Sequence, residues 1–224
     1  MAVGDFRVRP ARSAEELQEF EKWATMAEAG GPTLAEELLQ AHTAGNLSTA
    51  LRDAHRSYEA LLAGVMQNDF EAVAWSRTMA LVATLKGEVV GGLLAGPSAQ
   101  FLYDMAEKHD LGVVPVLDAL LHTSKLHLVA VDDSQRRRGA GEALISTAVS
   151  TAYLSGAQIL YGQFLTKNPG LAYFYGRQGF TLMPPETPLN FSAWMGGLSA
   201  GPAPLPGERF FYRDLSDAAF RMLG

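Results

Sequence analysis

Residues 136–141, Arg-Arg-Arg-Gly-Ala-Gly, combine residue types that favour the binding of a phosphate group. They fall between a β-prone run, 125–131, and an amphipathic helix expected to begin at Gly139. Glycine lets the backbone turn sharply and approach a ligand, while the first turn of a helix presents unpaired N–H groups and a positive dipole end. The arginines add fixed positive charge, which Asp132 and Asp133 largely offset. The backbone amides are therefore expected to carry the binding.

Two sequence signatures resemble those of the GCN5-related N-acetyltransferases (GNAT), enzymes that use acetyl-coenzyme A to acylate amines. The family's pyrophosphate loop has Gln or Arg, two free positions, Gly, one free position, then Gly or Ala, and residues 136–141 fit each constrained position. Asn168, Phe174-Tyr175 and Gly179-Phe180 are similar to the second signature, an asparagine followed by a short helix that carries a tyrosine and ends in Gly-Phe. The resemblance is specific over residues 81–180.

Hydrophobic periodicity indicates the elements that hold these signatures. Strands are predicted at 5–9, 79–86, 88–95, 125–131, 158–164, 180–183 and 209–213, with the second and third joined by a tight Lys86-Gly87 turn. Helices are predicted at 13–24, from 33 onward, along a face from Leu47 to Val65, and at 98–109, 116–121, 139–154 and 169–177. The resemblance implies the α/β (α+β) GNAT fold, a mixed, mostly antiparallel sheet of about six to seven strands flanked by helices.

Length and composition predict one globular domain over residues 1–224. Its best-matched core is 78–183, preceded by a helical N-terminal segment. A helical insertion at 98–124 separates strands 3 and 4, and 184–207 forms a loop rich in proline and glycine. Loops of that length in compact domains are often functional.

Composition also excludes several kinds of chemistry. The absence of cysteine excludes thiolate metal sites and an acyl-cysteine intermediate, and the net charge of −6 argues against a nucleic-acid partner. No basic, apolar leader and no apolar run of membrane-spanning length is present, so a cytoplasmic protein without a membrane partner is expected. No metal is predicted, because none of the histidines has a metal-ligand spacing: His42, His55, His109, His122 and His127.

The resemblance implies how acetyl-coenzyme A would bind. The edge of strand 125–131 would pair with the pantetheine amides, because this strand splays from 158–164 in the family and leaves a wedge for the arm. An amide near Val129 is the expected oxyanion donor, and Asn168 would hydrogen-bond the arm. The residues expected to contact the co-substrate are Val129, Val131, Arg136, Arg137, Arg138, Gly139, Ala140, Gly141, Asn168 and Tyr175.

Tyr175 matches the tyrosine with which family members assist departure of the coenzyme A thiolate. Full proton transfer from a phenol of pKa near 10 to a thiolate whose acid has a pKa near 8.5 costs roughly 2 kcal/mol, so a hydrogen bond is favoured over complete transfer. The alternative is an ordinary core aromatic residue on a helix that also carries Tyr173 and Phe174.

The general base is less defined by the sequence. Some family members place a glutamate near the start of the fourth strand, where this chain has Lys125. His127, which shares strand parity with Val129 and Val131, is the nearest substitute, acting directly or through water. A satisfied structural histidine is the alternative reading of His127. Further candidates in or beside the insertion are Glu107, His109 and His122.

The predicted function is transfer of an acetyl group from acetyl-coenzyme A to a primary amine by direct attack in a ternary complex. The alternative is a domain that binds coenzyme A without turnover, as a sensor, which Lys125 in the glutamate position supports. The acceptor is a small-molecule or peptide amine: an aminoglycoside, a polyamine, an amino acid and a protein N-terminus all stay open, as does a homodimer. The residues predicted to wall its site are Phe101, Tyr103, Asp104, Phe191 and Trp194.

Overall fold

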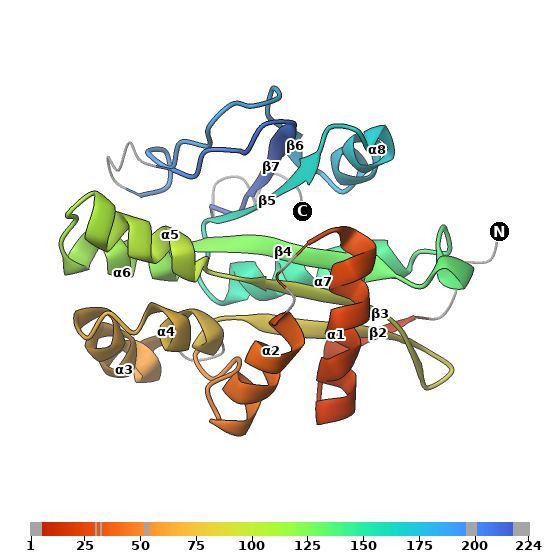
Figure 1. Cartoon of the computed structure of the whole chain (residues 1–224), viewed down its shortest axis with the longest axis horizontal. Coiled ribbons are helices and arrows are strands. Elements are labelled where there is room, and N and C mark those ends of the chain that lie inside the picture. Colours follow the sequence, from red (N-terminus) through yellow and green to blue (C-terminus); the bar gives the residue numbers. More distant parts are fainter. Residues whose placement is uncertain (1–5, 30, 32, 52–53, 196–200, 217–224) are drawn as a thin grey trace.

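The computed structural model describes residues 6–29, 31, 33–51, 54–195 and 201–216, with the backbone alone at 54–56 (Figure 1). Asp5, the predicted start of the first strand, and 196–200 in the late loop lie outside the described residues. The strands are β1 (Arg7–Pro10), β2 (Met79–Leu85), β3 (Glu88–Gly96), β4 (Thr123–Val131), β5 (Ile159–Leu165), β6 (Thr181–Leu182) and β7 (Glu208–Asp214). The α-helices are α1 (Ala14–Ala27), α2 (Leu34–Thr43), α3 (Ala54–Met66), α4 (Phe70–Ser76), α5 (Ala99–Tyr103), α6 (Val113–His122), α7 (Ala140–Leu154) and α8 (Pro169–Arg177).

The strands form one sheet in the order β1-β2-β3-β4-β5-β7-β6. Every neighbouring pair is antiparallel except β4 and β5, which are parallel because α7 connects them as a crossover. In Figure 1, α1 and α2 lie in front of the sheet and α7 lies behind it. The predicted mixed, mostly antiparallel sheet with flanking helices is confirmed, including the helical insertion between β3 and β4.

Three hydrophobic clusters hold these layers together. The α7 cluster lies between α7, α8 and one face of the sheet, and includes Leu144 and Phe211. The α1 cluster joins α1 and α2 to the opposite face, around Trp23. The insertion cluster covers that same face at β5 and β7, where helices α3 and α6 pack with Phe191 and Phe210. Each face of the sheet is therefore covered, and the sheet forms the middle layer.

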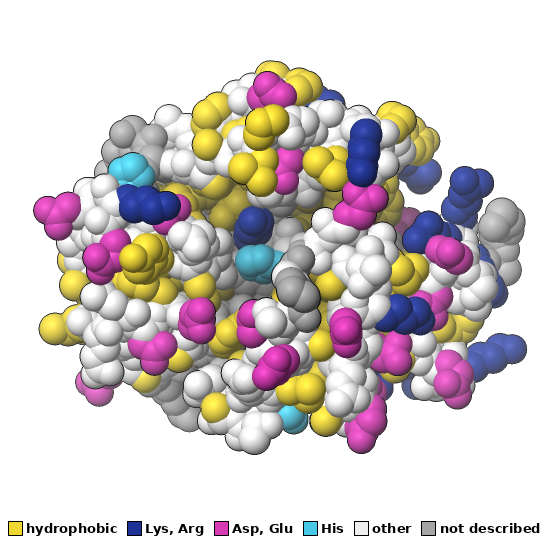
Figure 2. Space-filling view, in the orientation of Figure 1, with side chains coloured by type: hydrophobic (Ala, Val, Ile, Leu, Met, Phe, Trp, Pro, Cys, Tyr) yellow, Lys and Arg dark blue, Asp and Glu magenta, His cyan; other side chains and the backbone are white. Residues whose placement is uncertain are grey.

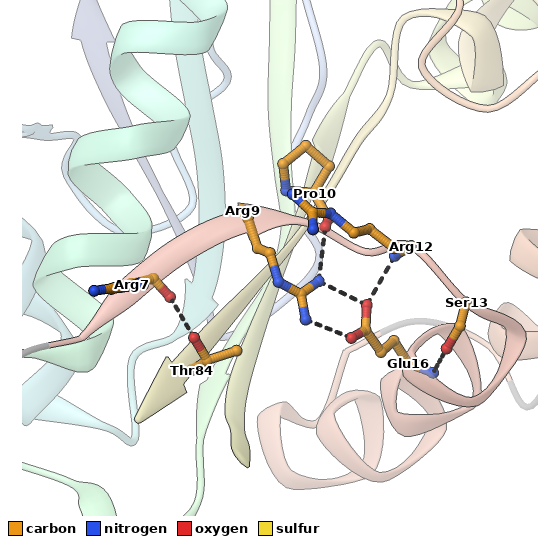
Figure 3. A network of polar contacts seen from close by, with 7 residues as sticks. All are labelled: Arg7, Arg9, Pro10, Arg12, Ser13, Glu16 and Thr84. Carbon is orange, nitrogen blue, oxygen red and sulfur yellow. Dashed lines mark hydrogen bonds and ion pairs between the residues drawn. The ribbon is translucent and has the colours of Figure 1, made fainter. Parts of the chain in front are cut away.

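A polar network fixes the position of α1, whose C-terminal end borders the functional site (Figure 3). The Glu16 carboxylate accepts hydrogen bonds from the Arg9 guanidinium at 2.5 and 2.8 Å and from the Arg12 backbone N–H at 2.8 Å. The Ser13 hydroxyl caps the helix by accepting from the Glu16 N–H, as the sequence signal predicts. The start of α1 is thus tied to β1, which itself pairs with β2.

The helix predicted from Leu47 begins later, at Ala54. Residues before it make tertiary hydrogen bonds instead of helical ones: the Ser48 hydroxyl donates to the Thr78 carbonyl at 2.5 Å, and the Ala50 N–H donates to the Ser76 carbonyl. Ser48 also has a left-handed φ of 63°, which a helix cannot contain. Ser76 is the last residue of helix α4, and Thr78 follows two residues later; this helix was not predicted because it spans only seven residues.

Arg77, directly after α4, ties this region to the rest of the molecule. Its side chain is buried and donates hydrogen bonds to the carbonyls of Ala50, Leu121 and Ser155 at 2.9–3.2 Å. Burial lowers the pKa of Arg77 to about 10, which leaves the guanidinium charged at neutral pH. Arg77 therefore links three segments through these carbonyls: the last turn of α6, the residue after α7 and the segment before α3.

Candidate active site

Strands β4 and β5 separate partway along their length. Their pairing joins Thr123 to Ile159 and continues only to Leu126 and Gly162, whereas β3 pairs with β4 as far as Val131. Residues 127–131 therefore present one backbone edge to no neighbouring strand, which is the wedge that the resemblance implies. An unpaired edge of this kind can hydrogen-bond an extended ligand that carries amide groups.

A cavity of about 1520 Å³ lies at this separation and is lined from both faces of the sheet. Gly139, Gly141, Phe174 and Tyr175 line it from the α7 and α8 side. The lining on the opposite side includes Trp75, Ser98, Lys125, His127, Gln163 and Glu208. Figure 2 shows the hollow from this second side, with basic and histidine side chains at its floor. Two molecules can therefore meet in it from opposite faces of the sheet.

The glycine-rich turn forms one end of the cavity. Gly139 adopts a left-handed φ of 101° as the residue before α7, and no side chain caps this helix. Its first-turn N–H groups have no described side-chain partner and could bind an anion. Gly141 lies on the first turn, where an added Cβ would approach the Phe174 ring to 3.4 Å. This is an ordinary van der Waals distance, so α8 lies in contact with the start of α7.

The three arginines differ in their placement. Arg136 and Arg137 line the cavity, although the Arg136 side chain also donates to the Val131 carbonyl and pairs with Asp133 at 2.9 Å. Arg138 does not line it and instead donates to Gln135 at 2.6 Å. Ala140 is buried in the α7 cluster. The other predicted contacts, Val129, Val131, Asn168 and Tyr175, all line the cavity.

His127 lies at an irregularity of β4. Leu94 pairs with Leu128 but Ala95 pairs with Leu126, so His127 is an extra residue in the strand, a β-bulge. Leu126 accordingly packs in the α7 cluster and Leu128 in the α1 cluster, on opposite faces. The predicted strand parity of His127 with Val129 and Val131 assumes a regular alternation, which the bulge interrupts.

The His127 imidazole is neutral at physiological pH. Burial is the main cause that lowers its pKa to about 4, and the nearby positive charge of Lys125 lowers it further. Hydrogen bonding to the backbone of Gly96 and Pro97 acts in the opposite direction but is outweighed. Its Nε2 lies 3.2 Å from the Gly96 carbonyl oxygen, so in the neutral ring this nitrogen carries the proton and donates it. Nδ1 is then the ring nitrogen with a lone pair.

Tyr175 belongs to an aromatic stack and also reaches the cavity. Its ring lies 3.8 Å from that of Phe211 and also contacts Phe164, Phe174 and Phe180. The residue is only 6% exposed, and burial raises the pKa of its phenol above the ordinary value. Tyr175 is therefore a core aromatic residue that also lines the cavity.

The predicted wall of the acceptor site is wrong. Phe101 and Trp194 each contact Phe191 in the insertion cluster, because these rings cover β5 and β7 rather than the cavity. Tyr103 is about half exposed elsewhere, and Asp104 pairs with Lys108 at 2.8 Å. Glu107, His109 and His122 also lie away from the cavity lining.

Polar residues of three neighbouring strands line this side of the cavity. Lys125 on β4 aligns with Tyr161 on β5, and Gln163 and Glu208 lie on the same face of β5 and β7. The Gln163 amide donates to both Glu208 carboxylate oxygens at 3.0 Å, and the Leu205 N–H donates at 2.8 Å. Sequence reasoning missed Gln163 and Glu208, although a polar residue within an apolar strand is a usable signal.

Lys125 carries the positive charge among these polar residues of β4, β5 and β7. Its side chain is partly buried, and burial lowers the pKa of the ammonium group, against the opposing influence of Glu208. Among the residues that the structure describes, no carboxylate lies within 4.0 Å of its Nζ. The ammonium group is therefore available to an anionic ligand.

Comparison with known proteins identifies the family. The sequence profile of the acetyltransferase (GNAT) family matches residues 47–180, more than half of the chain, which therefore belongs to this family and is an acetyltransferase. No curated protein matches the sequence.

Solved structures share the fold at low identity. The protein yncA from Salmonella typhimurium, with its cofactor acetyl-CoA, is 14% identical with a TM-score of 0.55, covering 95% of both chains. A GNAT acetyltransferase from Streptococcus pneumoniae is 13% identical with a TM-score of 0.52, covering 94% of this chain and 99% of its own. Ard1 from Thermoplasma volcanium is 16% identical with a TM-score of 0.50, covering 93% and 97%.

Within the described ranges, no three His, Cys, Asp or Glu side chains gather in a way that could hold a metal ion. No described helix is long and apolar enough to cross a membrane.

Proposed function

We propose that the protein transfers an acetyl group from acetyl-coenzyme A to the amine of a small molecule or peptide, by direct attack in a ternary complex. The observation that carries this proposal is the separation of β4 and β5, which opens a single cavity to both faces of the sheet. A thioester that enters from the α7 side can then meet an amine that enters from the α1 side.

The residues on the α7 side fit the parts of coenzyme A. Free N–H groups at Gly139 and in the first turn of α7 would hold the diphosphate, with Arg137 beside them. The open backbone edge at 127–131 would pair with the pantetheine amides, and Asn168 lines the cavity where β5 ends. A free N–H near Val129 would stabilise the oxyanion that develops on the thioester carbonyl.

The reaction needs one bond to form and one to break. The neutral amine nitrogen attacks the carbonyl carbon, a C–N bond forms, and the C–S bond breaks to release the thiolate. The Tyr175 hydroxyl would donate a hydrogen bond to that thiolate. Because burial raises the phenol pKa, we assign Tyr175 a hydrogen-bonding role and not complete proton transfer.

The nitrogen must lose a proton once it has attacked the carbonyl carbon. We propose that His127 orients the amine or a water molecule through Nδ1, and that Glu208 accepts this proton through water. Glu208 suits this role because Gln163 and the Leu205 N–H orient its carboxylate at the cavity.

The test is release of free coenzyme A in the presence of a panel of amines, together with calorimetry of coenzyme A binding. Acceptor-dependent thiol release supports the enzyme. Binding without acceptor-dependent release would instead support the non-catalytic sensor. A protein that binds neither form of coenzyme A would contradict both functions.

A further inference from the structure

We propose that the acceptor carries a carboxylate beside its amine, as a free α-amino acid does, and that Lys125 binds this carboxylate. The inference rests on the proposed function, because it names the substrate class of the same cavity. It makes Lys125 a specificity-determining residue. From the sequence, this position was notable only because Lys125 stands where some family members have a glutamate base.

The state of Lys125 is the first argument. Its ammonium group lines the cavity from a partly buried position and has no described carboxylate within 4.0 Å. A partly desolvated charge without a counter-ion is unfavourable, and an anionic ligand would compensate it. Neutral His127 beside it does not compete for that anion and adds no second charge.

The position of Glu208 is the second argument. Glu208 is near enough to favour the charged form of Lys125, yet it does not reach ion-pairing distance. Its carboxylate is held instead by Gln163 and the Leu205 N–H. A small zwitterion fits between the two groups, with its carboxylate at Lys125 and its amine toward Glu208, whereas a polyamine would bring a second cation against Lys125.

The remaining lining on this side indicates the character of the acceptor's side chain. Apolar groups from α1, α2, α4 and β3 line the same half of the cavity: Met26, Leu34, Trp75, Leu94 and Pro97. The acidic residues of the lining, Glu28, Glu37 and Glu71, are exposed, and among them Glu28, directly after α1, pairs with Lys167 at 2.7 Å. This arrangement favours an apolar side chain over an acidic one, because carboxylates at the rim repel a second negative charge.

The experiment compares matched acceptors that differ in the carboxylate. L-phenylalanine, L-phenylalaninamide and phenethylamine form one set, and L-leucine, L-leucinamide and isopentylamine form a second. Coenzyme A release is measured at varied acceptor concentration, and kcat/KM is expressed per neutral amine. The wild-type protein is expected to prefer the amino acid by about 10- to 100-fold, the range for a hydrogen bond to a charged group.

Variants of Lys125 then test the assignment. Lys125→Met should reduce the preference for the amino acid to near unity, mainly through KM, and Lys125→Arg should restore most of it. Lys108→Met is the control, because Lys108 pairs with Asp104 at 2.8 Å and neither residue lines the cavity. It should leave the preference unchanged.

Three results would overturn the inference. The first is equal turnover of amines with and without the carboxylate by the wild-type protein. The second is an equal loss for all acceptors in Lys125→Met, which would assign Lys125 to proton removal or to structure. The third is coenzyme A binding without release for any amine, which would overturn the proposed function and this inference with it.

Discussion

Replacement of Tyr175 by phenylalanine separates the two parts of this side chain, because it removes the hydroxyl and keeps the ring. The stack on Phe211 at 3.8 Å and the contacts with Phe164 and Phe180 do not depend on the hydroxyl. The Tm should therefore change by no more than about 2 °C, which corresponds to less than about 1 kcal/mol in a chain of this size.

The buried environment of the phenol also limits the effect of Tyr175→Phe on kcat. At ordinary pKa values, proton transfer from a phenol to a thiolate already costs about 2 kcal/mol. Burial raises the pKa of Tyr175 further, so its contribution is limited to a hydrogen bond to the departing thiolate. A hydrogen bond to a charged group contributes about 1.5–3 kcal/mol, and Tyr175→Phe should lower kcat by about 10- to 100-fold.

The assay combines steady-state thiol release with calorimetry of coenzyme A binding. Tyr161→Phe is the matched control, because Tyr161 is also buried and has a raised pKa but lies outside the cavity lining. It should retain wild-type kcat. The reasoning about Tyr175 is refuted if Tyr175→Phe turns over at the wild-type rate, or if its loss of activity follows a loss of coenzyme A binding.

Further predictions concern the phosphate turn, the buried arginine and the pH dependence of stability. Gly139 and Gly156 lie at the two ends of α7 with left-handed φ of 101° and 88°. Alanine at either position would be strained, so Gly139→Ala and Gly156→Ala should each lower the free energy of unfolding in urea by about 1–2 kcal/mol. Only Gly139→Ala should also weaken coenzyme A binding, by about tenfold in calorimetry if one amide contact of about 1.4 kcal/mol is lost; equal binding by both variants would contradict the site. Arg77→Met leaves three carbonyls without their donor and should cost about 3–5 kcal/mol in the same denaturation assay, whereas a loss below about 1 kcal/mol would contradict the network. The hydrogen bond from Arg9 lowers the pKa of Glu16 to about 2 from 4.5, so its carboxylate stabilises the fold above pH 4.5 and this contribution disappears as the pH falls toward 2. The stability difference between wild type and Glu16→Gln should shrink across that window, and a constant difference would show that the pair does not titrate.

Elements with strong local signals could be predicted from the sequence. The Lys86-Gly87 turn between two β-prone runs places β2 and β3, and helix α8 has its predicted bounds of Pro169 to Arg177. Gly139 marks the start of α7 because a left-handed residue is needed there, which is a property of the local backbone. The elements that form this half of the cavity could therefore be predicted from the sequence.

The acceptor half depends on tertiary structure and could not be predicted in the same way. A register shift between β3 and β4 creates the bulge at His127, and no residue type at that position signals it. Lys125 and Glu208 are far apart in the chain and come onto one face only through the order β4-β5-β7. The predicted aromatic wall was wrong because composition alone does not distinguish rings that line a cavity from rings that fill a core.

The insertion cluster has a consequence for the redesign of this enzyme. Phe101 from the insertion and Phe191 from the late loop meet edge to face over Tyr161, at 5.2–5.3 Å between ring centroids. The insertion and the late loop therefore cover each other through these two rings. A chimera that imports either segment alone from another acetyltransferase would expose its partner's aromatic rings, so the two must be exchanged as one module.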